Sequence, residues 1–252
     1  MSGHDYLASL LAAQNLGDRE LQPLRNARDA IEQWLRGEIG SAPRIYYGGS
    51  FAKGTMLRAS YDLDIVVYFP STDARTLQQL FTRVHQRLLA GNLIVHPRTV
   101  ALRLPYESGF HIDVVPGRAQ DSSFRYATLY KSTMPPSTLQ TSLKVHIDAV
   151  KDAGLSEMVR IAKLWRLRHS LDVSTFALEL AVGRAMQGVR RDDLGTAFWT
   201  VPGYLAGEFT TARLVDPANT NNVIEVSQST RNVVAARAQH SREQKNWSTI
   251  VW

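Results

Sequence analysis

The sequence has no cysteine among its 252 residues. This absence excludes disulfide bonds, thiolate catalysis and cysteine-ligated zinc within the chain. No stretch approaches 18 consecutive apolar residues, so we expect no membrane-spanning helix. The first 20 residues, MSGHDYLASLLAAQNLGDRE, lack the basic region and the long apolar run of a signal peptide. We therefore expect a cytoplasmic protein.

The composition is that of a globular protein, with 44% hydrophobic and 21% charged residues. The length suits one large domain or two small ones. Lysine and arginine number 29 against 23 acidic residues, which gives a formal net charge of +6. This excess suits a polyanionic ligand such as a nucleotide or a nucleic acid, but it is equally typical of a mildly basic surface.

The first half of the chain alternates helical and strand patterns. Residues 24–35 place Leu24, Ala27, Ile31, Trp34 and Leu35 on one helical face. We expect Ser71, Thr72 and Asp73 to cap the next helix, and the turn ESG to join the last two strands. The strands expected in this half are RIYY at 44–47, DLDIVVYF at 62–69, TVALRLPY at 99–106 and FHIDVVPG at 110–117.

From about Leu139 the pattern becomes helical. Three helices are expected, at 142–154, 156–170 and 174–188, and the polar tail from Gln228 to Lys245 also favours a helix. The segment MPPST around Pro135 and Pro136 is the best candidate for a linker. The sequence therefore predicts a mixed α/β fold, with a small mixed β-sheet and an N-terminal helix in residues 1–135 and a helical lobe in residues 136–252.

The segment GGSFAKGT after the first strand invites comparison with a P-loop. Gly49 and Gly54 have the spacing of the P-loop glycines, but Thr55 stands where that motif requires lysine. Lys53 comes one residue too early, and a strand follows where the motif requires an amphipathic helix. The P-loop interpretation is therefore rejected.

Three aspartates in apolar strands form a candidate metal site. Asp62 and Asp64 are two residues apart, so strand alternation points both carboxylates to one face. Asp113 is a lone acid in FHIDVVP, on a strand expected to neighbour the first. Any one of these aspartates could be a simple turn or hairpin residue. Together they could hold two Mg²⁺ or Mn²⁺ ions roughly 3.5–4 Å apart, as in phosphoryl transfer.

Gly48, Gly49 and Ser50 complete this candidate site. Glycine allows backbone N–H groups to approach an anion closely, and the Ser50 hydroxyl adds a donor for a phosphate oxygen. A short helix at SFAKGT would also point its N-terminus at the phosphates. His111 shares the face of Asp113 and could touch a nucleotide or serve as a hydrogen-bonded strand histidine. Arg118 could contact phosphate or base, or lie in solvent.

Taken together, GGSFAKGTMLRASYDLDIVVYF and HIDVVP resemble the polymerase-β-like nucleotidyltransferase superfamily, whose signature is Gly-Ser, Asp-x-Asp and a distant third Asp. Within it, the chain is similar to the oligoadenylate-synthase-like and cyclic-GMP-AMP-synthase-like enzymes (CD-NTases). The features of that branch are the Lys-Gly-Thr loop, DVVP after the third acid, IAKLWR ahead of STFALEL, and DPANTNNV at 216–223.

The resemblance implies an active site in a cleft between the sheet and helical lobes. It implies that Gly49 and Ser50 hold a donor triphosphate, and that Asp62, Asp64 and Asp113 bind magnesium. Asp113 would also help to deprotonate the attacking hydroxyl.

Two further residues carry over from the resemblance. Lys163 and Ser174 would contact the triphosphate from the helical lobe. The residues alone leave other interpretations open, because Lys163 also suits a solvated helix face and Ser174 a helix N-cap.

The implied function is a magnesium-dependent nucleotidyltransferase. It would join nucleoside triphosphates, ATP or others, into a cyclic di- or oligonucleotide second messenger and release pyrophosphate. Linear 2′–5′ oligomers are the variant product. The chain lacks the cysteine-rich zinc element of the nucleic-acid-sensing animal synthase, and its charge is modest for a nucleic-acid sensor. A bacterial antiphage synthase with a separate downstream effector fits better.

Two alternatives stay open at this point. One is nucleotidyl transfer to a protein, an RNA end or a small molecule, and the other is a non-catalytic nucleotide- or RNA-binding module. The sequence leaves open the bases used, the linkage, the ring size, the activating signal and the oligomeric state. A monomer is compatible with the sequence.

Overall fold

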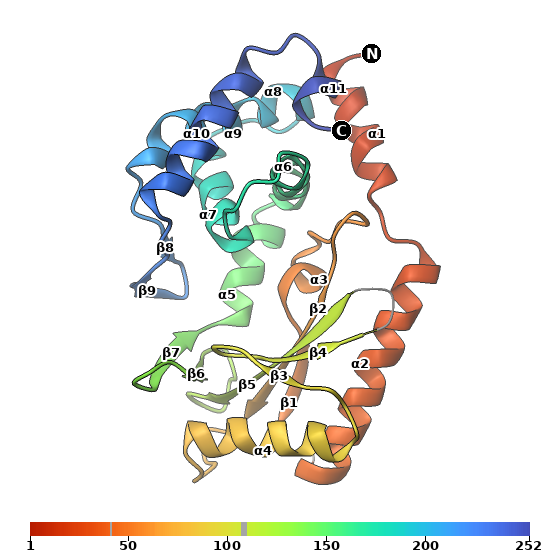
Figure 1. Ribbon diagram of the computed structural model, residues 1–252, viewed down its shortest axis with the longest axis vertical. Helices are drawn as coiled ribbons and strands as arrows, with labels where there is room; N and C mark the ends of the chain where they lie inside the picture. The colour runs from red at the N-terminus through yellow and green to blue at the C-terminus, as the bar shows by residue number, and fades with distance from the viewer. Residues whose placement is uncertain (41, 107–109) are drawn as a thin grey trace. The chain divides into compact units, whose positions relative to one another are not determined.

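The computed structural model describes residues 1–40, 42–106 and 110–252 (Figure 1). The chain forms two compact units. The sheet unit comprises Leu16–Gly54 and Ser60–His146, and the helical unit comprises Met1–Asn15, Thr55–Ala59 and Ile147–Trp252. The fold is mixed α/β, as predicted, but the division differs from the expected single boundary at residue 135.

The sheet unit is built on a seven-stranded mixed sheet. Strands follow the order β1-β2-β5-β4-β3, and β6 joins β5 and β7. Only β2 and β5 pair in parallel among the described strands; the other pairs of this sheet are antiparallel. The strands are β1 Arg44–Tyr47, β2 Leu63–Phe69, β3 His96–Pro97, β4 Leu102–Pro105, β5 His111–Ala119, β6 Ala127–Lys131 and β7 Ser137–Thr141.

β2 and β5 lie inside the sheet rather than at its edges, and most of their residues are apolar. All residues of β2 except Asp64 are buried, as expected for a strand enclosed on both faces. The predicted strands at 44–47, 62–69, 99–106 and 110–117 are confirmed in position, with their ends shifted by a few residues. The expected turn at residues 107–109 lies outside the described residues.

The two longest helices of the sheet unit are α2 and α4. α2, Asp18–Ile39, buries Leu24, Ala27, Ile31 and Leu35 of the predicted apolar face, whereas Trp34 is only partly buried. α4, Leu77–Ala90, lies against β5 and β6.

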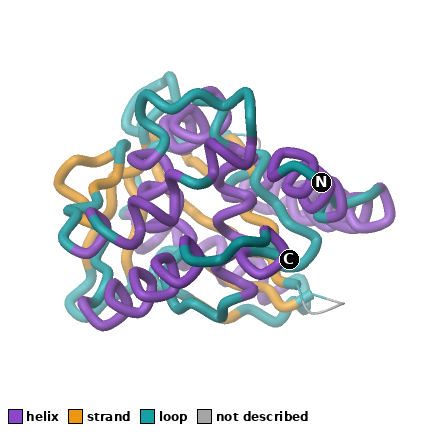
Figure 2. The backbone as a smooth tube through the Cα atoms, turned by 90° about the horizontal axis from the view of Figure 1, so that it is seen from above, coloured by secondary structure: helices purple, strands orange, loops and turns teal. Residues whose placement is uncertain are grey.

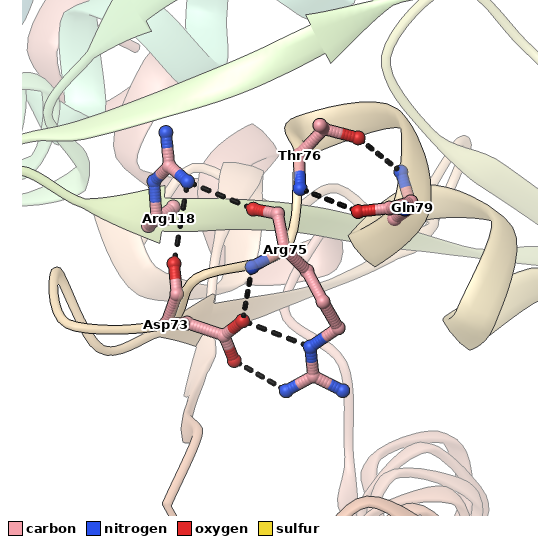
Figure 3. Close-up of polar contacts among 5 residues, drawn as sticks. All are labelled: Asp73, Arg75, Thr76, Gln79 and Arg118. Carbon is pink, nitrogen blue, oxygen red and sulfur yellow. Dashed lines mark hydrogen bonds and ion pairs between the residues drawn. The ribbon is translucent and has the colours of Figure 1, made fainter.

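The predicted cap of α4 at Ser71–Asp73 is wrong. Thr76 caps this helix instead: its hydroxyl accepts from the Gln79 N–H, and the Gln79 side chain accepts from the Thr76 N–H (Figure 3). The Asp73 side chain does not cap the helix, because it accepts hydrogen bonds from the backbone N–H and the guanidinium of Arg75. That arginine holds the pKa of the Asp73 carboxyl below its usual range.

The predicted linker MPPST is a hairpin loop. β6 and β7 pair in antiparallel register from Ala127↔Thr141 to Lys131↔Ser137, and Pro135 and Pro136 lie in the connection between them. The hairpin belongs to the sheet unit, which continues through β7 and most of α5 to His146, so the boundary at residue 135 falls inside a compact unit.

Helices, purple in Figure 2, make up most of the helical unit. The predicted helix at 142–154 is divided into the α-helix α5, Leu143–Ile147, and a π-helical turn, Asp148–Asp152. The predicted burial of Met158, Ile161, Ala162 and Trp165 is confirmed. The remaining elements are α1 Gly3–Ala13, α6 Ser156–Arg168, α7 Thr175–Ala185, α8 Leu194–Phe198, α9 Thr200–Ala206, η3 Glu208–Thr210, β8 Val215–Asp216, β9 Asn219–Val223, α10 Gln228–Arg242 and α11 Trp247–Ile250.

None of the helices in the described ranges combines the length and the apolar character needed to cross a lipid bilayer.

Candidate active site

The parallel pair β2 and β5 brings two of the predicted acids together. Asp64 on β2 and Asp113 on β5 are register partners, one directly beside the other. Neighbouring residues in register point their side chains to the same face of a sheet. The sequence prediction that the strand of Asp113 neighbours the strand of Asp64 is thus confirmed, and the two carboxylates share one face.

Asp62 joins this face just before β2 begins. The Asp62 Oδ2 lies 3.4 Å from His111 Nε2, and the Asp113 Oδ2 lies 3.7 Å from the same nitrogen. His111 therefore lies between two of the acids and holds the position that its alternation with Asp113 predicts. We call Asp62, Asp64 and Asp113 the acidic cluster.

Residues 48–50, which we call the glycine loop, lie directly against the acidic cluster. The Gly48 N–H donates to the Asp64 carbonyl oxygen over 2.8 Å. Gly49 has a φ of +49°, and a Cβ added there would come 1.6 Å from Asp64 Oδ2. A side chain at residue 49 would thus occupy the place of the Asp64 carboxylate. The glycine is required for the close approach as well as for its conformation.

Gly49 also opens the short helix α3, Gly49–Lys53, which confirms the helix predicted at SFAKGT. Gly54 ends it in the left-handed conformation with a φ of +67°. Within the described part of the chain, the Ser50 hydroxyl is buried and has no hydrogen-bond partner. A buried hydroxyl without a partner is costly, so this atom fits a site that completes its hydrogen bonds with a ligand.

We therefore expect Ser50→Ala to leave the free energy of unfolding unchanged or slightly higher, because it removes a buried polar atom that lacks a partner. Nucleotide affinity should fall by about tenfold, since a charge-assisted hydrogen bond to the triphosphate is lost. Urea unfolding and calorimetric titration with a non-hydrolysable ATP analogue measure the two effects. Ser132→Ala is the matched control, because that exposed hydroxyl donates to the Arg98 carbonyl. A stability loss without an affinity loss in Ser50→Ala would contradict this role.

Sequence reasoning missed Arg103. This residue lies on β4 opposite Asp113, and its Nε and Nη2 donate to Asp113 Oδ1 and Oδ2 over 2.9 and 2.7 Å. The hydrogen bond to Asp113, followed by the charges of Asp113, Asp62 and Asp64, raises the pKa of the Arg103 guanidinium. The available signal was a single arginine inside the apolar strand TVALRLPY.

The residue types of the acidic cluster fit magnesium, which prefers hard oxygen ligands. Two carboxylates share a face in register, and Asp62 lies beside them. Across the described ranges, however, no set of three or more acidic or histidine side chains is spaced to hold an ion. In addition, Arg103 donates hydrogen bonds to both oxygens of Asp113. Asp113 could bind a cation only by sharing or releasing one of these hydrogen bonds.

Lys163 and Ser174 lie in the helical unit, where each has a local partner. The Lys163 Nζ donates to the Thr55 carbonyl oxygen over 2.9 Å. The Ser174 hydroxyl accepts from the Ala177 N–H over 3.1 Å and caps α7. The N-cap interpretation of Ser174 is thus confirmed, and the triphosphate roles of both residues stay predictions.

Arg118 has a structural role at the other end of β5. Its Nη1 donates to the carbonyl oxygens of Arg75 and Asp73, at 2.8 and 3.4 Å (Figure 3). These hydrogen bonds tie the segment before α4 to the sheet. Neither the phosphate nor the solvent interpretation of Arg118 accounts for this contact.

The chain is similar to known nucleotidyltransferases in sequence and in fold. Residues 34–122 match the family described as Nucleotidyltransferase domain. The chain is 28% identical over 218 residues to a cyclic AMP-AMP-AMP synthase from Escherichia coli, which covers 77% of this chain and 66% of the synthase. It is 31% identical over 128 residues to a c-di-GMP synthase from Roseivirga ehrenbergii, which covers 45% of this chain and 33% of that enzyme. The matches thus span from a third to about two thirds of these relatives.

The fold is also found in solved structures. The structure of Escherichia coli CdnC with ATP superposes with a TM-score of 0.74 at 22% identity and covers 95% of this chain and 90% of CdnC. The matched family segment contains the glycine loop and all of the acidic cluster. The chain therefore contains a nucleotidyltransferase domain and has the polymerase-β-like fold of the CD-NTases.

Proposed function

We propose that this protein is a magnesium-dependent nucleotidyltransferase that makes a cyclic di- or oligonucleotide second messenger from nucleoside triphosphates and releases pyrophosphate. The observation that carries this proposal is the register of Asp64 with Asp113 on parallel strands, with Asp62 beside them and the Gly49 backbone against Asp64. Carboxylates placed in this way beside a glycine-rich loop suit phosphoryl transfer.

In this reaction the protein mainly positions reactants and supplies charge. The glycine loop and Ser50 would bind the donor triphosphate. A hydroxyl oxygen of the acceptor nucleotide would attack the α-phosphorus, and the bond from that phosphorus to the bridging oxygen would break as pyrophosphate leaves. Asp113 is the candidate to accept the hydroxyl proton. We also propose that Lys163 and Ser174 contact the triphosphate.

Asp62, Asp64 and Asp113 would hold the cation. When bound, magnesium or manganese would neutralise charge on the phosphate oxygens and favour loss of the proton of the attacking hydroxyl. The need for such a cation follows from charge, because a cluster of carboxylates repels a triphosphate unless positive charge lies between them.

The similarity to cyclic-nucleotide synthases supports the product class. The relative from Escherichia coli is named for cyclic AMP-AMP-AMP and the one from Roseivirga ehrenbergii for c-di-GMP, so one fold is compatible with different bases and ring sizes. We further propose a role in cytoplasmic antiphage signalling through a separate effector. One support is the similarity to an Escherichia coli protein named as a CBASS oligonucleotide cyclase, 24% identical over 161 residues.

The test is the fate of labelled phosphate. The protein is incubated with each α-labelled triphosphate and with mixtures of all four, in magnesium or in excess EDTA. We expect a phosphatase-resistant small nucleotide that forms only with the metal, and mass spectrometry then gives its bases and ring size. Label that appears on an added RNA, protein or small acceptor instead would replace a synthase by a transferase that modifies that acceptor. Nucleotide binding without any transfer and without metal dependence would contradict the proposal.

A further inference from the structure

The ion pair between Arg103 and Asp113 ties one member of the acidic cluster to β4 through two hydrogen bonds. The two residues face each other across antiparallel strands, and the guanidinium meets both carboxylate oxygens through two separate nitrogens. The side chains are 32% and 15% exposed, respectively. A two-point pair of this kind is stronger and more directional than a single hydrogen bond.

The charge of Arg103 acts on the whole cluster. Asp62 and Asp64, as well as Asp113, contribute to the raised pKa of the guanidinium, so all three carboxylates lie within its electrostatic reach. Three carboxylates on one face repel each other, and one fixed positive charge relieves part of that repulsion. Arg103 therefore does for the metal-free cluster part of what a bound cation would do.

The same contact opposes a metal ion in two ways. The oxygens that Asp113 would offer to a cation already accept hydrogen bonds from Arg103. A divalent cation placed among the carboxylates would also be repelled by the guanidinium nearby. Both effects weaken metal binding in the protein without nucleotide. A triphosphate brings additional oxygen ligands and negative charge, which offset this repulsion.

We propose that Arg103 is a positioning residue that competes with the metal: it holds Asp113 in place in the nucleotide-free protein and keeps the metal affinity low until the triphosphate arrives. This inference rests on the proposed function, because it takes the acidic cluster as the metal site. It goes further by proposing that the metal binds tightly only together with the nucleotide, and not to the nucleotide-free protein.

The experiment measures Mn²⁺ binding to the nucleotide-free protein by the electron paramagnetic resonance signal of free Mn²⁺, so that no catalytic activity is needed. Arg103→Met should bind Mn²⁺ about tenfold more tightly than the unaltered protein. Arg103→Lys keeps the charge but loses the two-point contact, so its gain should be smaller. With a non-hydrolysable ATP analogue present, the difference between Arg103→Met and the unaltered protein should shrink.

Arg118→Met is the matched control. It removes an arginine from the neighbouring strand β5 that binds backbone carbonyls and none of the three acids. Its Mn²⁺ affinity should equal that of the unaltered protein, even if its melting temperature falls. Melting temperatures of every variant show whether it is folded, and Arg103→Lys serves as the test if Arg103→Met does not fold.

The outcomes separate this inference from the proposed function. Equal Mn²⁺ binding by Arg103→Met and the unaltered protein, lost on Asp62→Ala with Asp64→Ala, would overturn the competition and leave the metal site standing. Weaker binding by Arg103→Met would also overturn it, because Arg103 would then help to build the site. No Mn²⁺ binding by any variant, with or without nucleotide, would overturn both proposals.

Discussion

Replacing Asp62 and Asp64 together by alanine is expected to lower nucleotidyl transfer by about a thousandfold or more. These two carboxylates would supply most of the charge that holds the cation, because both oxygens of Asp113 already accept hydrogen bonds from Arg103. The fold should persist, because removal of two acids from one face relieves like-charge repulsion. The measurement is the initial rate of pyrophosphate release with magnesium and a mixture of triphosphates.

The matched control for this prediction is Asp121→Ala. Asp121 lies just after the C-terminal end of β5, whereas Asp113 lies near its N-terminal end. The Asp121 carboxylate accepts hydrogen bonds from the backbone N–H and the hydroxyl of Ser123. Its loss should leave the rate of transfer within about twofold, since it lies outside the site. A double variant at Asp62 and Asp64 that stays folded and keeps the transfer rate of the control would show that the chemistry takes place without the acidic cluster.

Gly49→Ala is expected to damage both stability and activity. The substitution places a β-carbon where the Asp64 carboxylate lies, in a backbone conformation with φ of +49°. The left-handed conformation and the displaced carboxylate together should cost about 1–3 kcal/mol in the free energy of unfolding. Because a displacement of about 1 Å in a catalytic group can cost about a hundredfold in rate, we expect a loss of that size in kcat/KM.

Gly37→Ala provides the comparison for this prediction. Gly37 lies inside α2, and a β-carbon added there meets no atom within 4 Å. Alanine favours a helix interior over glycine by about 0.5–1 kcal/mol, so this variant should be slightly more stable and fully active. Urea unfolding and steady-state kinetics on both variants give the result. If Gly49→Ala matched Gly37→Ala in both measurements, the close approach of the loop to Asp64 would have no functional role.

The acidic cluster could be predicted from sequence because it rests on local rules. Alternation along a strand places Asp62 and Asp64 on one face, and a lone acid in an apolar run marks Asp113 as unusual. That the two strands are neighbours was expected from the apolar character of both segments, which is typical of strands inside a sheet. The requirement for glycine at residue 49 also has a local signal in GGS, although its contact with Asp64 depends on how the loop folds back.

Arg103 could not be assigned from sequence because its role depends on cross-strand register. The pairing of Arg103 with Asp113 requires β4 to align with β5 in one particular register, and a shift by one residue would turn the guanidinium to the other face. The sequence pattern of TVALRLPY alone does not fix that register.

The errors at Ser71–Asp73 and at residue 135 have a common cause. In both places the residue types are typical of the predicted feature, but contacts with a neighbouring residue or strand give the segment another role. Asp73 resembles a helix cap but binds Arg75, and Thr76 caps α4 in its place. Pro135 and Pro136 resemble a linker, but β7 follows them and returns the chain to the sheet.

The most direct test is a crystal structure with Mn²⁺ and a non-hydrolysable triphosphate, read by the anomalous signal of manganese. We predict a manganese peak in contact with carboxylate oxygens of Asp62 and Asp64, and phosphate density against the Gly49 and Ser50 backbone. We also predict that at least one Arg103 hydrogen bond to Asp113 lengthens or breaks. A triphosphate bound elsewhere, or manganese that contacts none of the three acids, would contradict the central claim that the acidic cluster and the glycine loop form the site of nucleotidyl transfer.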